Sequence, residues 1–164
     1  MRNNTVIDRR RQRQSINTMY FNRFLAIRYL MAVSFFINLY MLIFTFNHSL
    51  FAFIPGTLII LSIGCIFQLF KMNGGKKPRS NLIEYYFKSN FIMNIFALVI
   101  AIFIRVSSII PYFTDLYQTK IIIITIYLVQ VFISYISLNR LNKIKNNKDK
   151  QFSRIKKYEK ILKI

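Results

Sequence analysis

The sequence predicts an all-α integral membrane protein, a four-transmembrane-helix bundle with both termini cytoplasmic. The chain combines 54% hydrophobic residues with a formal net charge of +19, and the two kinds of residue are segregated along it. Apolar stretches of roughly twenty residues, about the length that a helix needs to cross a ~30 Å hydrocarbon core, alternate with basic segments. The length of 164 residues leaves room for one domain.

The segment 1–28 is predicted to be a basic tail followed by an interfacial entry into the membrane. Four arginines fall between Arg9 and Arg13, so residues 1–15 are expected to be a loosely held, solvated tail. Basic side chains next to a membrane attract anionic head groups by roughly 1 kcal/mol each. No nucleic-acid partner is expected, because no recognition fold accompanies these arginines.

The membrane domain is predicted over 29–138, and its first two spans, about 29–46 and 50–70, form a helical hairpin. Only a few residues separate the two spans, so the helices must run antiparallel. Asn38 lies on the polar face of the first span, together with Ser34 and Thr45.

Small residues predict where the spans pack closely on one another. Small side chains let membrane helices approach, and polar side chains add modest interhelical hydrogen bonds. The candidate packing positions are Ala52, Gly56, Gly64 and Ala101.

The third span, about 89–110, carries a stripe of small and polar residues among Phe, Ile, Val and Met. On a helical wheel the stripe holds Asn90, Asn94, Ala97, Ala101, Arg105 and Ser108. A lipid-facing surface would not gather such residues, so the stripe is expected to face the bundle interior. The fourth span, about 121–138, has its own polar stripe, which includes Gln130.

Arg105 is the one charge inside a predicted span. Such a charge is costly and usually faces a bundle interior or a cavity. It lies roughly 9 Å below Pro111, a distance that an arginine can partly snorkel. Asp115 is the only acidic residue expected on that side, so an Arg105–Asp115 ion pair is predicted. The alternative is contact with a partner or substrate, for which the candidates are Arg105, Asn94, Asn38 and Gln130.

The segment 139–164 is predicted to be a basic amphipathic tail. Its apolar residues are spaced three or four apart, at Phe152, Ile155, Tyr158 and Leu162. Such a helix suits the surface of an anionic membrane, and a solvated helical tail is the alternative.

The distribution of basic residues predicts the topology. The segments before the first span, between the second and third spans, and after the fourth span hold seven, five and ten Lys or Arg, which is 22 of the 24. Cytoplasmic segments retain Lys and Arg, so both termini and the middle loop are expected in the cytoplasm. Abundant Ile, Asn, Lys, Phe and Tyr use AT-rich codons, which indicates a low-GC bacterium and its cytoplasmic membrane.

No enzyme, cofactor or metal chemistry is expected. No carboxylate lies within a predicted span, and Cys65 is the only cysteine. His48 and Cys65 are seventeen residues apart, about 25 Å along a helix, which is too far for a nucleophile–base pair. A proton-coupled transporter usually needs an embedded Asp, Glu or His.

The start of the first span, RFLAIRYL…FFIN, resembles the small four-helix flippases of lipid-linked sugars. The resemblance covers this one helix, the later spans do not continue it, and no function follows from it.

The sequence therefore favours a non-enzymatic membrane interaction protein. It would be an accessory subunit of a bacterial secretion or transport complex, or an immunity protein against a membrane-acting toxin. Its partners would be another membrane protein or a second copy, beside a bilayer with anionic head groups. The alternatives are a pore or permease subunit for small solutes or anions, and a lipid-handling protein.

Overall fold

A computed structural model describes residues 2–46, 52–71, 81–105 and 116–162 of the chain. This part of the chain is helical throughout its regular structure and contains no strand. The helices are α1 (Arg2–Arg23), α2 (Leu25–Thr45), α3 (Phe53–Lys71), α4 (Asn81–Phe103), α6 (Tyr117–Lys145) and α7 (Lys150–Leu162).

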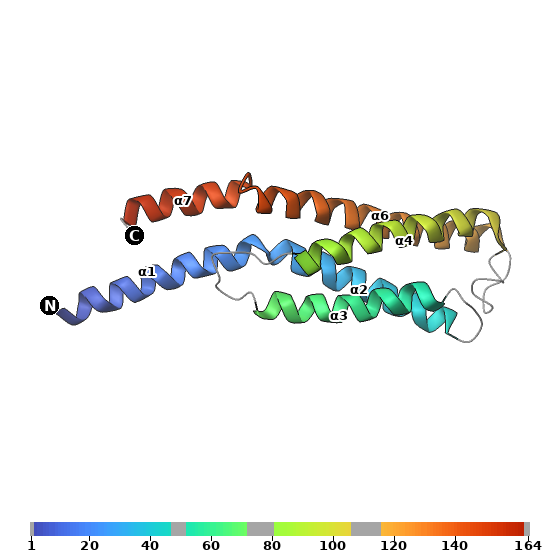
Figure 1. The fold of residues 1–164 in the computed structure, drawn as a ribbon, viewed down its shortest axis with the longest axis horizontal. Helices are drawn as coiled ribbons and strands as arrows, with labels where there is room; N and C mark the ends of the chain where they lie inside the picture. Colours follow the sequence, from blue (N-terminus) through green and yellow to red (C-terminus); the bar gives the residue numbers. More distant parts are fainter. Residues whose placement is uncertain (1, 47–51, 72–80, 106–115, 163–164) are drawn as a thin grey trace.

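Four of these helices, α2, α3, α4 and α6, alternate in direction and form a bundle (Figure 1). Each helix packs on the next in the sequence, and α6 returns to contact α2. The segments that contain these four helices are long and apolar enough to cross a membrane. The prediction of an all-α chain with four such helices is therefore confirmed.

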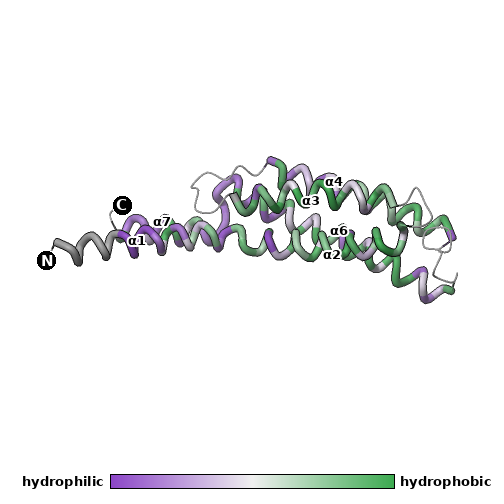
Figure 2. The backbone as a smooth tube through the Cα atoms, turned by 90° about the horizontal axis from the view of Figure 1, so that it is seen from below, coloured by the Kyte–Doolittle hydropathy of each residue, from purple (hydrophilic) through white to green (hydrophobic). Residues whose placement is uncertain are grey.

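The outer faces of the bundle carry large apolar side chains, whereas polar side chains lie inside. Phe36, Ile60, Phe96 and Phe132 are all more than half exposed. Figure 2 shows hydrophobic residues along the four bundle helices and mostly hydrophilic residues along α7 and the coloured part of α1. This inverted arrangement is what a helix bundle needs when its surroundings are lipid rather than water.

The bundle helices are longer than the apolar stretches that predicted them, or are shifted along them. α4 begins at Asn81 rather than near 89 and ends at Phe103 rather than near 110, and α6 continues to Lys145 rather than 138. Hydropathy marks where apolar residues end, but hydrogen bonding continues through the lysines, arginines and glutamate that flank them, which are good helix formers.

α1 and α7 lie side by side, antiparallel, beyond the end of the bundle (Figure 1). The chain is helical from Arg2, where a loosely held tail was expected. Ile16 of α1 and Ile155 of α7 are 4% and 1% exposed. The apolar face of α7, predicted to rest on a membrane surface, is thus partly covered by α1. We call this antiparallel pair of helices the basic hairpin, although α1 and α7 come from opposite ends of the sequence and no turn joins them directly.

Some predicted features fall outside the described residues. These are the turn containing His48, the loop over 72–80, the predicted end of the third span at 110, and Asp115 as the partner of Arg105.

Candidate functional site

A cluster of uncharged polar side chains lies at the centre of the bundle. All its members are buried and come from α2, α4 and α6, and we call it the central polar cluster: Ser34, Asn38, Tyr86, Asn90, Asn94, Gln130 and Ser134.

Asn90 is the hub of the central polar cluster. Its Nδ2 donates to Ser134 Oγ (2.7 Å) and Ser34 Oγ (3.1 Å). Its Oδ1 accepts from Asn94 Nδ2 (2.9 Å) and, at a longer 3.4 Å, from Asn38 Nδ2. One fully buried amide therefore contacts three helices.

Gln130 closes the contact between α6 and α2. Its Oε1 accepts from Ser34 Oγ (3.0 Å), and its Nε2 donates to the backbone oxygen of Ser34 (3.2 Å). Ser34 Oγ also shares a 3.0 Å hydrogen bond with Tyr86 OH. Because these groups satisfy one another, the cluster stabilises the packing of three helices and carries no charge for chemistry.

The candidate contact residues are divided between the bundle centre and its far end. Asn38, Asn94 and Gln130 are at most 3% exposed and bonded within the chain. Arg105 is exposed, because α4 ends at Phe103 and the wheel of the predicted third span stops there. A role for these residues in binding a partner or substrate stays a prediction.

The small residues proposed for helix packing have different surroundings. Ala101 is 2% exposed and belongs to an apolar cluster with Met41 and Ile123. A Cβ on Gly56 would lie 3.7 Å from Leu42 Cδ1 of α2, in ordinary contact. Ala52 is half-buried, and Gly64 is exposed with no atom near enough to meet an added Cβ.

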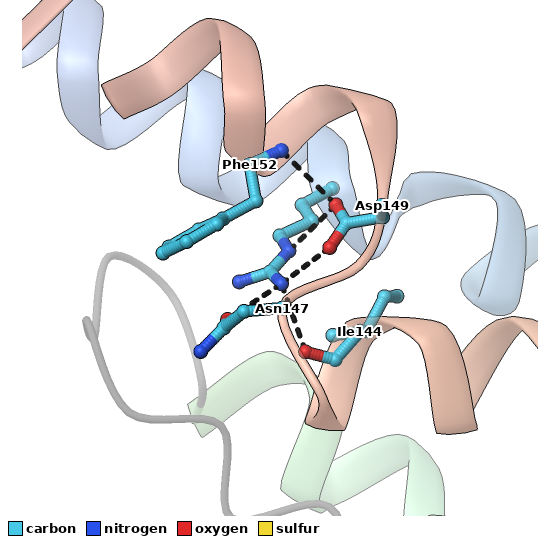
Figure 3. A network of polar contacts seen from close by, with 5 residues as sticks. Ile144, Asn147, Asp149 and Phe152 are labelled. Carbon is cyan, nitrogen blue, oxygen red and sulfur yellow. Dashed lines mark hydrogen bonds and ion pairs between the residues drawn. The ribbon is translucent and has the colours of Figure 1, made fainter. Parts of the chain in front are cut away.

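A second polar cluster lies where α1 meets the turn between α6 and α7, and Arg23 is its centre. We call it the Arg23 joint: Arg23, Ile144, Asn147, Asp149 and Phe152 (Figure 3).

The Arg23 side chain is 2% exposed and bonds through its Nε and Nη2 atoms. Its Nε donates to Asp149 Oδ2 (2.9 Å), and its Nη2 contacts Asp149 Oδ1. The same Nη2 donates to the Ile144 carbonyl (2.8 Å) and to Asn147 Oδ1 (2.9 Å). The guanidinium lies 4.8 Å from the ring centre of Phe152, within cation–π range. Arg23 thus ties α1 to both sides of the turn between α6 and α7.

The local sequence builds this turn. Asn147 adopts φ 54°, a left-handed conformation that asparagine tolerates at a helix end. Its backbone N–H donates to the Ile144 carbonyl (3.1 Å). Asp149 precedes α7, and its Oδ2 accepts the backbone N–H of Phe152 (3.1 Å), as an N-cap does. The same carboxylate therefore starts α7 and holds Arg23.

The basic hairpin has a strongly cationic surface. Tyr20 OH donates to Glu159 Oε1 (3.3 Å), and Asp149 is bonded to Arg23. Glu159 of α7 and Asp149, which caps α7, therefore both have partners within the basic hairpin. Its exposed basic side chains are Arg10, Arg11, Arg13, Lys150, Arg154, Lys156, Lys157 and Lys160.

Nothing in residues 10–46, 52–70, 81–105 and 116–161 groups three or more His, Cys, Asp or Glu side chains that could hold a metal ion. Comparisons with known protein families, with curated proteins and with solved structures give no match to this chain. The resemblance of the first span to flippases of lipid-linked sugars therefore gains no support.

Proposed function

We propose that this chain is a non-enzymatic protein of the bacterial cytoplasmic membrane that presents the basic hairpin to an acidic protein partner in the cytoplasm. The observation that carries the proposal is the Arg23 joint, which fixes two basic helices together beyond the end of the apolar bundle. The role would be that of an accessory subunit of a secretion or transport complex, or of an immunity protein against a membrane-acting toxin.

The direction of the basic hairpin favours a partner in water over the membrane surface. α1 has 22 residues, about 33 Å of helix, and continues along the long axis of the molecule away from the bundle (Figure 1). The electrostatic attraction of charged lipid head groups is largely screened beyond about 8 Å at physiological salt. The outer part of the basic hairpin is therefore too far from the bilayer to interact with it strongly.

The charge of the basic hairpin supports an acidic protein as the partner. A surface of one sign attracts a complementary surface, raises the association rate and excludes partners of the same sign. The concentration of Lys and Arg at this end also favours a cytoplasmic location for both termini.

The central polar cluster gives less support to a pore or permease. Its amides and hydroxyls are bonded to one another, so a solute path through the centre would have to break those bonds.

Purification from the native host in a mild detergent tests the proposal. The variant Lys156→Gln/Lys157→Gln/Lys160→Gln removes three exposed charges from the basic hairpin, and we expect a stoichiometric acidic protein to be recovered about tenfold less than with the unaltered chain. The matched control, Arg105→Gln, removes an exposed charge at the opposite end and should retain the partner.

Retention of the partner by the triple variant would contradict the proposal. Loss of the partner in Arg105→Gln alone would also contradict it, because the contact would then lie at the other end of the bundle.

A further inference from the structure

A groove of about 480 Å³ lies beside the Arg23 joint, between the last turns of α6 and the start of α7. This volume is within the range of small-molecule sites. Its lining changes from apolar to basic along α6 and into α7, through Tyr135, Ile136, Arg140, Lys143, Lys148 and Lys150.

The position of the groove along α6 matches the edge of a hydrocarbon core. No charged residue lies between Lys120 and Arg140. Twenty residues of helix span about 30 Å, the thickness of that core. Arg140 therefore comes at head-group depth in an inserted bundle, and Lys143 lies about one turn further out. Tyr135 and Ile136, which are 58% and 37% exposed, lie on the acyl-chain side.

The groove carries an excess of positive charge that the described chain does not neutralise. Its five basic residues face one acidic residue, Asp149, which gives a net charge of +4. Asp149 is already bonded to Arg23. The described residues give no ion pair to the other four basic residues, Arg140, Lys143, Lys148 and Lys150. Clustered Lys and Arg are the usual partners of a phosphate group.

We propose that this groove binds the phosphate head group of one anionic phospholipid, whose acyl chain runs along Tyr135 and Ile136. The basic lining supplies the phosphate contact, and the exposed apolar residues next to it favour a lipid over a free phosphate ion. The proposal rests on the membrane insertion proposed above. It does not depend on the protein partner, so either can fail while the other holds.

The chain contains no tryptophan, so one introduced tryptophan reports on its own surroundings. Tyr135→Trp places the reporter in the groove, and Tyr40→Trp places a control on an exposed part of α2 at the other end of the bundle. The protein is reconstituted in phosphatidylcholine vesicles, and brominated phosphatidylglycerol or brominated phosphatidylcholine is added as a quencher. We expect a five- to tenfold preference for phosphatidylglycerol in the Tyr135→Trp variant and little preference in the Tyr40→Trp variant.

Two substitutions connect the preference to the groove. Arg140→Gln/Lys143→Gln should reduce the ratio of quenching by phosphatidylglycerol to quenching by phosphatidylcholine to about one. Lys156→Gln/Lys157→Gln removes the same charge from the basic hairpin outside the groove and should leave it unchanged. Helicity measured by circular dichroism checks that the variants remain folded.

Three outcomes would overturn the proposal. They are a preference that survives Arg140→Gln/Lys143→Gln, an equal preference in the Tyr40→Trp control, and displacement of phosphatidylglycerol by millimolar inorganic phosphate. The last outcome would assign the groove to a free phosphate ion. The proposal would be supported if the preference for phosphatidylglycerol is lost only in Arg140→Gln/Lys143→Gln and does not change when inorganic phosphate is added.

Discussion

The central polar cluster and the Arg23 joint both connect distant helices through buried polar side chains, but they use different chemistry. The cluster relies on neutral amides and hydroxyls around Asn90. The joint relies on an ion pair between Arg23 and Asp149. The cluster lies within the part of the bundle that is long enough to cross a membrane, where a charge is expensive. The joint lies at the end of that part, where Asp149 keeps 15% of its side chain exposed.

This difference indicates that the two parts of the molecule are stabilised separately. The cluster holds α2, α4 and α6 together, whereas the joint holds the basic hairpin to the end of α6. We therefore expect that the basic hairpin can separate while the bundle stays folded.

The largest effect is expected for Arg23→Ala. The substitution leaves Asp149, the Ile144 carbonyl and Asn147 without their shared donor, a loss of about 3 kcal/mol in the docking of α7. Hydrogen exchange of the α7 backbone amides should rise on the order of 100-fold, while exchange in the bundle stays the same.

Arg13→Ala is the matched control, because Arg13 is exposed on the same helix. It should leave the exchange of α7 unchanged. The double variant Arg23→Met/Asp149→Asn removes both charges, keeps a side-chain oxygen that can cap α7, and should recover part of the lost protection. If the α7 backbone amides still exchanged slowly in Arg23→Ala, the Arg23 joint would not be what holds α7 against α1.

A smaller effect is expected for Asn90→Leu in the bundle. It removes the amide that bonds to the buried side chains of Asn94, Ser134 and Ser34, so each of them loses one hydrogen bond. The free energy of unfolding in detergent should fall by about 1–3 kcal/mol. Thr125→Leu is the control, because Thr125 is exposed and, among the described residues, bonds only to Ile121 of its own helix. Its effect should be under about 0.5 kcal/mol. If the free energy of unfolding fell equally in Asn90→Leu and Thr125→Leu, the central polar cluster would contribute no more to stability than an exposed threonine.

The smallest effect is expected at the exposed ion pairs of Glu84. Its carboxylate bonds to Lys88 (2.8 Å) and Lys145 (3.1 Å), and both lysines are more than half exposed. Glu84→Gln should cost about 0.2–1 kcal/mol in low salt and almost nothing in 1 M salt. The effect of Arg23→Ala, measured at the same two salt concentrations, should change far less, since its charge is buried. If the effect of Arg23→Ala depended strongly on salt, the ion pair of Arg23 would behave like the exposed ion pairs of Glu84.

The sequence predicted the bundle well because the signals are local. Four apolar stretches identify the helices, and the polar stripes that include Asn38, Asn90 and Gln130 fall on the buried faces of their helices. The start of α4 and the end of α6 were predicted less well, since Lys, Arg and Glu end an apolar stretch without ending a helix. Arg105 was placed on the buried stripe because the wheel assumed a helix that continues past Phe103.

The Arg23 joint was missed because it is a long-range contact. Arg23 and Asp149 are 126 residues apart, and no pattern in one sequence pairs them. Weaker local signals were available. Asn146 and Asn147 followed by Asp149 combine a helix-ending pair with an N-cap residue. Ile16 and Tyr20, with Phe24 directly after α1, are spaced four apart and so indicate one apolar face.

Cross-linking in intact membranes tests the basic hairpin most directly. With Cys65 replaced by alanine, Tyr20→Cys/Glu159→Cys places two thiols where α1 contacts α7, whereas Thr18→Cys/Glu159→Cys moves one thiol to an exposed face of α1. We expect a short bifunctional reagent to cross-link the first pair efficiently and the second pair little. Cross-linking of the first pair should be lost when Arg23→Ala is added. Equal cross-linking of the two pairs, or none of either, would contradict the pairing of α1 with α7 and the surface proposed for the partner.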